Sequence, residues 1–165
     1  MDLLSAATTT SLAGTPEEAY RQLRELADKA ALVNLSVLYS MAVDDHDLDT
    51  VVACFAPDGT FTRLGTTVRG HGELRTFYGS MMDRYVTTLH TPESHVAVVD
   101  VDAGTATGVV NGHGELALGD QLLLAAYRYD EPCHRFLERT RGPLARAPAV
   151  PRASTSGKQS TRSPS

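Results

Sequence analysis

Three long extended runs in the second half of the chain constrain the fold more than any other feature. They cover Thr87–Val101, Thr105–Leu118 and Gln121–Tyr129. Only Asp102-Ala103-Gly104 and Gly119-Asp120 separate them, and both have the composition of tight turns. Connections this short join antiparallel neighbours, because a parallel connection needs a crossover of about a dozen residues. The second half of the chain is therefore predicted to form an antiparallel meander.

The first half of the chain indicates helices. Thr15-Pro16-Glu17-Glu18 is a capping box with proline at the first helical position, so a helix is predicted to begin there. From Ala30 to Val43 apolar residues occupy nearly every face. This pattern is typical of a helix that protein covers on several sides, and it predicts a central helix that ends at Asp44 and Asp45.

Shorter elements are predicted between the central helix and the meander. Asp47 can cap a short helix that runs through Phe55. Thr60–Leu64 and Thr66–Arg69 are predicted strands of a hairpin around Gly65, and Gly70-His71-Gly72 leads into a further helix. Helices followed by a meander predict an α+β fold with the helices on one face of a curved sheet.

Length and composition predict one folded domain with loose ends. A chain of 165 residues with 42% hydrophobic residues can build one ordinary core. Residues 1–14 are small and polar and are predicted to be a flexible arm, and residues 15–141 form the predicted domain. Residues 142–165 are rich in Pro, Ala, Arg, Ser and Thr, so they cannot offset their ordering entropy by burial. We expect this basic tail to be disordered.

Charge and cysteine content disfavour several classes of protein. The net charge is −5, and the tail carries four basic residues and no acid, which leaves −9 (−5 minus +4) for residues 1–141. So acidic a body argues against a nucleic-acid partner. The start of the chain lacks a basic region and no apolar run approaches a membrane span, so no membrane partner is expected. Cys54 and Cys133 have no metal-ligand spacing, and reduced thiols favour a cytoplasmic protein.

Several short segments, taken in order, carry a resemblance to a known family. They are Tyr39–Asp44, Asp47–Asp49, Cys54–Phe61, Val68–Gly70, Val98–Asp102 and Gly112–Leu116. With this order and spacing, roughly residues 20–141 resemble a SnoaL-like domain of the nuclear transport factor 2-like superfamily. That superfamily includes polyketide cyclases, scytalone dehydratase, limonene epoxide hydrolase and ketosteroid isomerase.

The resemblance implies a cone-shaped fold, in which a strongly curved antiparallel sheet wraps around a long helix and opens to a pocket for a small molecule. It also implies a homodimer formed through the outer face of the sheet. In scytalone dehydratase-like members the pocket holds an aspartate at the end of the long helix and two histidines on neighbouring strands. Asp44, His90 and His113 match these positions. Val43 and Arg63 stand where that enzyme has tyrosines, so its particular reaction is not carried over.

An aspartate and a histidine in a dry pocket can move protons beside a carbonyl group, because the carboxylate fixes the tautomer and stabilises the imidazolium. One hypothesis is therefore a lyase, isomerase or cyclase that needs no cofactor or metal. The alternative is a ligand-binding or dimerisation module without catalysis, since one scaffold carries both kinds of protein.

Each candidate residue also has a purely structural interpretation. Asp44 could end its helix in solvent, and His90 could be a solvated histidine at a strand end. Strict alternation from Thr105 puts His113 on the same face as Asn111 and Glu115, and that face could be an outward polar one.

Overall fold

The computed structural model describes residues 11–134, with side chains up to Tyr129. The elements in chain order are α2 (Pro16–Asp44), α3 (Leu48–Ala53), β1 (Thr60–Arg63), β2 (Thr66–Arg69), α4 (Gly70–Arg84), β3 (Thr87–Asp100), β4 (Thr105–Leu118) and β5 (Gln121–His134). The strands β3-β4-β5 form one antiparallel sheet, and β1 and β2 form a separate hairpin. The predicted α+β class is confirmed. The predicted tail, residues 142–165, and residues 1–10 of the predicted arm lie outside the described residues.

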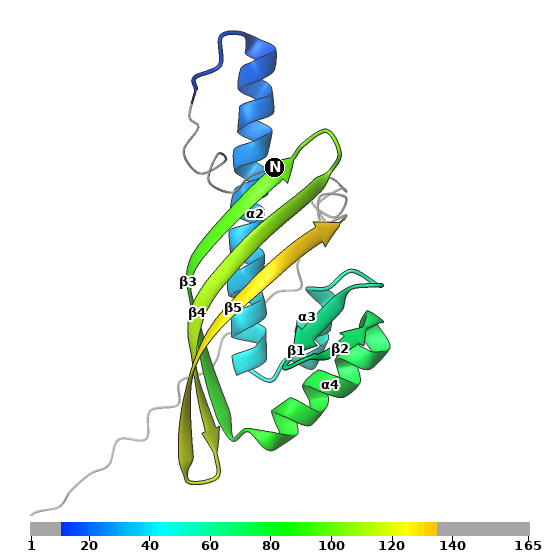
Figure 1. Cartoon of the computed structure of the whole chain (residues 1–165), viewed down its shortest axis with the longest axis vertical. Helices are drawn as coiled ribbons and strands as arrows, with labels where there is room; N and C mark the ends of the chain where they lie inside the picture. The colour runs from blue at the N-terminus through cyan, green and yellow to red at the C-terminus, as the bar shows by residue number, and fades with distance from the viewer. Residues whose placement is uncertain (1–10, 135–165) are drawn as a thin grey trace, which may run out of the picture.

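The curved sheet lies across one side of α2, and its strands cross the helix diagonally (Figure 1). The short helices and the β1–β2 hairpin gather beside the C-terminal half of α2, and the first turns of α2 extend past the sheet. Strand β5 continues to His134, beyond the predicted end at Tyr129. Pro132 is compatible with this extension because, among residues 11–134, β5 is an edge strand of its sheet.

A single helix covers both segments that the sequence indicated as helical. α2 has 29 residues, or about 44 Å at 1.5 Å per residue. The predicted capping box is present: the Glu18 backbone N–H donates to Thr15 Oγ1 at 3.2 Å, and the Thr15 backbone N–H donates to Glu18 Oε2 at 3.1 Å. Two of the N–H groups that every helix start leaves unpaired are satisfied in this way.

One row of α2 side chains faces the sheet. Its members are four residues apart, and those that are buried are Asp28, Leu32, Ser36 and Ser40. A row at this spacing is inclined to the helix axis, which matches the diagonal crossing of the strands (Figure 1). Apart from Leu32 the row is polar. The serines are satisfied along the helix, since Ser36 Oγ donates to the Val33 carbonyl at 2.8 Å and Ser40 Oγ to the Ser36 carbonyl at 3.0 Å.

The prediction that protein covers this helix on several sides is wrong for one face. Val33, Val37, Leu38 and Met41 are 40–57% exposed. The apolar residues between Ala30 and Val43 were expected to mark buried faces, but the sheet covers the polar row instead.

Two apolar clusters hold the described part of the chain together. In the first, Leu32 packs with Val99 and Ala106 of the sheet and with Val101 in the turn between β3 and β4. The second joins the C-terminal half of α2 to α3 and α4, through Ala42, Val51, Val52, Leu74 and Tyr78. Along α2, Ser36 and Ser40 lie between Leu32 of the first cluster and Ala42 of the second. A polar stretch of helix therefore faces the sheet between two apolar anchors.

The cap at the start of α2 can be tested. Thr15→Ala removes the hydroxyl that accepts from Glu18 and should lower the free energy of unfolding by about 0.5–2 kcal/mol. Urea denaturation measures the loss. Thr15→Ser keeps the hydroxyl and is the matched control, for which we expect near wild-type stability. Equal stability of all three proteins would show that the first turn of α2 does not contribute to the cooperative fold.

Candidate active site

Asp44 and His90 form a closely bonded pair where the end of α2 meets the start of β3. The imidazole Nδ1 of His90 lies 2.7 Å from Asp44 Oδ1, and the backbone N–H of His90 donates to Asp44 Oδ2 at 2.7 Å. Thr88 Oγ1 donates to Asp44 Oδ1 at 2.8 Å. A carboxylate that accepts all three bonds leaves the proton of His90 on Nδ1 and the lone pair on Nε2. The side chains of His90 and Asp44 are 15% and 16% exposed, so solvent still reaches the pair.

The position of Asp44 is unfavourable for the helix itself. It is the last residue of α2, and the last turn contains no basic residue. A negative charge at a helix C-terminus opposes the helix dipole, with an effect of about 0.3–1 kcal/mol. The three donors from β3 offset this cost. The carboxylate is therefore better explained by its role beside His90 than by any contribution to the helix.

A β-bulge in β3 brings a second histidine to the same face of the sheet. The pairing of β3 with β4 shifts between Pro92 and Ser94, which leaves Glu93 as the extra residue. Side chains alternate along a strand, so His90 and His95, five positions apart, would face opposite sides of a regular strand. Because of the extra residue, His95 faces the same side of the sheet as His90. Its Nδ1 lies 3.4 Å from Ser36 Oγ on α2.

Glycines on β4 make room for these inward side chains. Cβ atoms added at Gly108 and Gly114 would lie 3.2 Å and 3.6 Å from Nε2 of His95 and His90 respectively. A Cβ at Gly112 would collide with the Thr91 carbonyl oxygen and with the Tyr127 hydroxyl. The inner face of β4 is thus a glycine floor, defined by these three residues, and larger side chains from β3 and β5 lie over it.

Tyrosines from β5 complete the wall beside the pair. The ring of Tyr127 lies 6.0 Å from the ring of His90 and stacks on Tyr129 at 4.9 Å. Burial raises the pKa of Tyr127, and a hydrogen bond to Ser40 opposes the shift. Burial also raises the pKa of Tyr129. Both phenols therefore stay protonated at neutral pH and can act as hydrogen-bond donors.

His113 does not join Asp44 and His90. It pairs across the strands with Thr91, one position from the pair of His90 with Gly114, and side chains one position apart face opposite sides. His113 is 63% exposed on the outer face, with Nδ1 2.9 Å from Glu93 Oε1. The expectation that it lines a pocket with Asp44 is not met, and the structural alternative, an outward polar face, describes its position.

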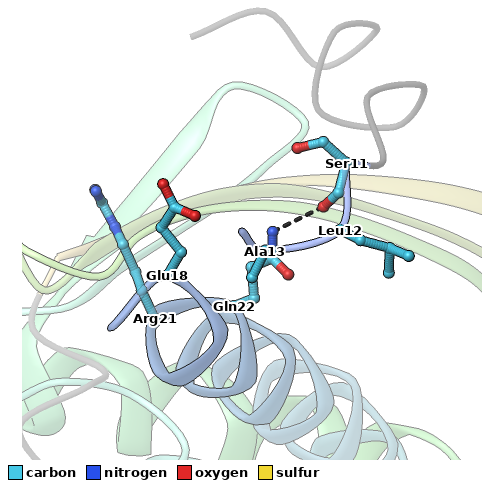
Figure 2. Close-up of a pocket in the computed structure, with 6 residues that line it drawn as sticks. All are labelled: Ser11, Leu12, Ala13, Glu18, Arg21 and Gln22. Carbon is cyan, nitrogen blue, oxygen red and sulfur yellow. Dashed lines mark hydrogen bonds between the residues drawn. The ribbon is translucent and has the colours of Figure 1, made fainter. Parts of the chain in front are cut away.

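Two hollows lie elsewhere on the described part of the chain. One, of about 340 Å³, separates residues 11–13 from the first turns of α2, where Gln22 Nε2 donates to the Ser11 carbonyl at 2.8 Å (Figure 2). Glu18 and Arg21 also line it, but Glu18 belongs to the helix cap and Arg21 pairs with Asp102 at 2.6 Å. The other hollow lies on the outer sheet face beside His113 and Glu115. Neither is lined by Asp44 or His90.

Among residues 11–134, no cluster of three or more His, Cys, Asp or Glu side chains has the arrangement of a metal site. The expectation that no apolar run approaches a membrane span is wrong for α2, which by length and composition could cross one; core helices of soluble proteins and signal sequences pass the same test. Its Ser36 and Asp44 side chains bond to the sheet, as described above.

The family follows from the match of the sequence with known domains. Residues 24–136 match the SnoaL-like domain. The chain belongs to the SnoaL-like domain family. The match contains α2 from its third turn onward and every strand, so it includes the Asp44–His90 pair. The family lies within the nuclear transport factor 2-like superfamily, as the resemblance implied. No curated protein matches the chain.

Solved structures share the fold of this SnoaL-like domain at low sequence identity. A protein of unknown function from Mycobacterium tuberculosis has 21% identity and a TM-score of 0.58, and the match covers 64% of this chain and 65% of that one, just under two thirds. A type 2 hexachlorocyclohexane dehydrochlorinase has 21% identity and a TM-score of 0.58, with 67% and 79% covered. An LEH-like epoxide hydrolase from Mycobacterium tuberculosis has 16% identity and a TM-score of 0.54, with 65% and 72% covered. At these identities the likeness shows the fold alone.

Sequence reasoning missed three side chains near the pair: His95, Tyr127 and Ser40. Alternation from His90 places His95 outside, and the sequence signal for the bulge at Glu93 is the neighbouring Pro92, because proline within a sheet lies at edges, strand starts or bulges. Tyr127 and Tyr129 could have been found, because two aromatic residues two positions apart lie on one face of a strand. Ser40 lies four residues before Asp44, on the same row of α2, and this spacing was available in the sequence.

The glycine floor can be tested by two matched substitutions. Gly112→Ala forces a Cβ against a backbone carbonyl and the Tyr127 ring, and should destabilise the protein by about 1–3 kcal/mol, as overpacking does. Gly114→Ala places its Cβ in ordinary contact with His90, at 3.5 Å from Cδ2, and should cost much less. Thermal and urea unfolding compare the two variants. A Gly112→Ala protein as stable as Gly114→Ala would contradict the close approach of β5 to β4.

His95 should make stability depend on pH. Burial lowers its pKa in the folded protein, so the unfolded chain binds the proton more readily. The contribution of the neutral ring is present above the unfolded pKa of about 6.5 and is lost as pH falls through the lower folded value. We expect the free energy of unfolding to fall below pH 6.5, and His95→Gln to flatten this dependence. A pH profile that is the same in His95→Gln and in the wild type would show that burial of this ring does not contribute to the dependence.

Proposed function

We propose that this SnoaL-like domain binds a small organic molecule and acts as a lyase, isomerase or cyclase that needs no cofactor. The substrate class is a small, largely apolar compound with a carbonyl or hydroxyl group. Asp44 and His90 are the acid–base pair. The observation that carries the proposal is the threefold bonding of Asp44, which fixes one tautomer of His90 in a site that solvent still reaches.

The geometry supports a simple proton-transfer step. With Nδ1–H held by Asp44, the lone pair on Nε2 of His90 can remove a proton from the carbon next to a carbonyl group. The imidazolium that forms is stabilised by the Asp44 carboxylate, and it can return the proton to another carbon or to a leaving hydroxyl. The neutral phenol of Tyr127 lies beside the imidazole and can donate a hydrogen bond to an oxygen that gains charge. Such a step serves elimination, isomerisation and ring closure alike.

A second candidate function is ligand binding without catalysis. It is favoured by the packing of Tyr127 against both His90 and Tyr129, because the protein's own side chains then occupy part of the space beside the pair. A homodimer and a cytoplasmic location also belong to our proposal. The thiol Cys54 fits a reducing compartment.

The first test is a thermal-shift screen of small carbonyl and hydroxyl compounds against the full chain. A ligand at about 100 times its Kd should stabilise the protein by roughly 2.7 kcal/mol. Compounds that stabilise the protein are then tested for turnover. Asp44→Asn keeps the shape of the side chain but removes the charge that stabilises the imidazolium, so we expect turnover to fall by about 10²–10⁴.

His113→Asn is the matched control, because His113 lies on the outer face and should not affect turnover. A second readout does not depend on activity: the ring ¹⁵N signals of His90 should show the Nδ1–H tautomer in the wild type and a mixture in Asp44→Asn. Unchanged turnover and an unchanged tautomer in Asp44→Asn would exclude the acid–base pair. Ligand binding without turnover would favour the binding module.

A further inference from the structure

The outward face of α2 is apolar over most of its length. Its large exposed side chains are Leu23, Leu26, Val33, Val37, Leu38 and Met41, which are 40–63% exposed. Ala27 and Ala30 are exposed on the same face, and Asn34, also exposed, is its one polar member. We call these nine residues the α2 stripe. The helix is therefore inverted, with its polar row toward the sheet and its apolar stripe toward solvent.

The spacing within the α2 stripe is that of a helix–helix seam. Leu23, Leu26, Ala30, Val33 and Val37 follow each other at intervals of three and four, the a and d positions of a heptad pattern. From Leu23 to Met41 the stripe is about 27 Å long at 1.5 Å per residue. A single asparagine inside such a seam is a recognised device for fixing register.

The rest of this chain offers little that could cover the stripe. Outside the described residues 11–134, residues 1–10 have three large apolar residues, Met1, Leu3 and Leu4, among small and polar ones. Residues 142–165 contain no aromatic residue, and their large apolar residues are Leu144 and Val150. Residues 135–141 add Phe136 and Leu137 among three arginines and a glutamate. This composition does not match a seam of six large apolar side chains.

A lipid surface fits the stripe less well than protein does. Helices that lie on anionic membranes carry Lys and Arg on their polar face. α2 instead contains five acidic residues (Glu17, Glu18, Glu25, Asp28, Asp44) and three basic ones (Arg21, Arg24, Lys29). The net charge of α2 is therefore −2, and residues 1–141 as a whole carry −9. Both charges repel anionic lipid.

We propose that the α2 stripe is the contact surface for a second copy of this chain, packed antiparallel about a twofold axis. A twofold interface uses the same patch twice, so the patch must be self-complementary. With the axis near Leu32, Leu23 meets Met41 of the second copy, Leu26 meets Leu38, and Ala30 meets Asn34. Leu23 and Leu26 at one end then face Met41 and Leu38 from the other end, Val37 faces the small Ala27, and the small Ala30 lets the helices approach beside the axis.

The outer sheet face is a poorer candidate for the same role. Its exposed apolar residues, such as Leu122 and Leu124, share that face with the Glu93–His113 pair and with Asn111, which bonds to Ser94. The first turns of α2 also stand clear of the sheet, so a second helix can reach them (Figure 1). One helix pair is at the low end of specific interfaces, about 1,000–1,200 Å² in total, so we expect a reversible dimer with Kd on the order of micromolar.

Sedimentation equilibrium of the full chain tests this proposal. The wild type should show a monomer–dimer equilibrium, and Val37→Lys should raise its dissociation constant at least about 100-fold, because the lysine would lie inside the seam, opposite Ala27 of the second copy. Leu26→Lys is a second variant with the same expected effect. Leu124→Lys changes a 77% exposed leucine on the outer sheet face and should leave the equilibrium unchanged. Circular dichroism checks that each variant is folded.

The remaining outcomes each overturn the proposal. A dimer that survives both α2 variants but is lost in Leu124→Lys would place the interface on the sheet. A wild type that stays monomeric up to hundreds of micromolar would exclude the second copy. Binding of a monomeric wild type to vesicles of phosphatidylcholine and phosphatidylserine, lost in Val37→Lys, would assign the stripe to lipid.

Discussion

The carboxylate of Asp44 is the interaction on which the arrangement of helix and sheet depends. Among the described residues, strand β3 pairs with β4 on one side and with no strand on the other, so the backbone N–H groups along that second edge need other partners. Asp44 accepts one of them, from His90, together with the side chains of His90 and Thr88. The same bonds fix where the sheet begins relative to the end of α2. A group that orients a histidine for chemistry thus also determines how the two main elements of the fold meet.

Local signals predicted the elements of this fold well. The capping box at Thr15, the helix cap at Asp47 and the hairpin around Gly65 are all present. Leu64 and Gly65 both have positive φ, at 50° and 81°, as a tight hairpin turn requires. These features depend on a few neighbouring residues, and this is why the sequence reveals them without knowledge of the tertiary structure.

Which face of an element points inward was harder to predict. Alternation along β4 separated two faces correctly, but the family resemblance placed His113 in a pocket although it lies on the outward face. The face that points inward carries Gly108, Gly112 and Gly114, and glycine has no side chain by which a sequence pattern could mark it as interior. The side chains that fill the space over these glycines belong to His90, His95 and Tyr127 on other strands. In α2 the apolar pattern was likewise real but pointed outward, since hydrophobicity indicates a surface to be covered and not the partner that covers it.

The bulge at Glu93 has a consequence for how this strand can vary. Inward positions on a regular strand are an even number of residues apart, whereas His90 and His95 are an odd number apart. The extra residue reverses the side of the sheet that every later side chain of β3 faces. Loss of Glu93, with the pairing to β4 kept, would remove the bulge and leave the two histidines four positions apart, so both would still face inward on a regular strand. Elsewhere in β3, where no unpaired residue takes up the change, loss of one residue would turn the strand beyond it inside out.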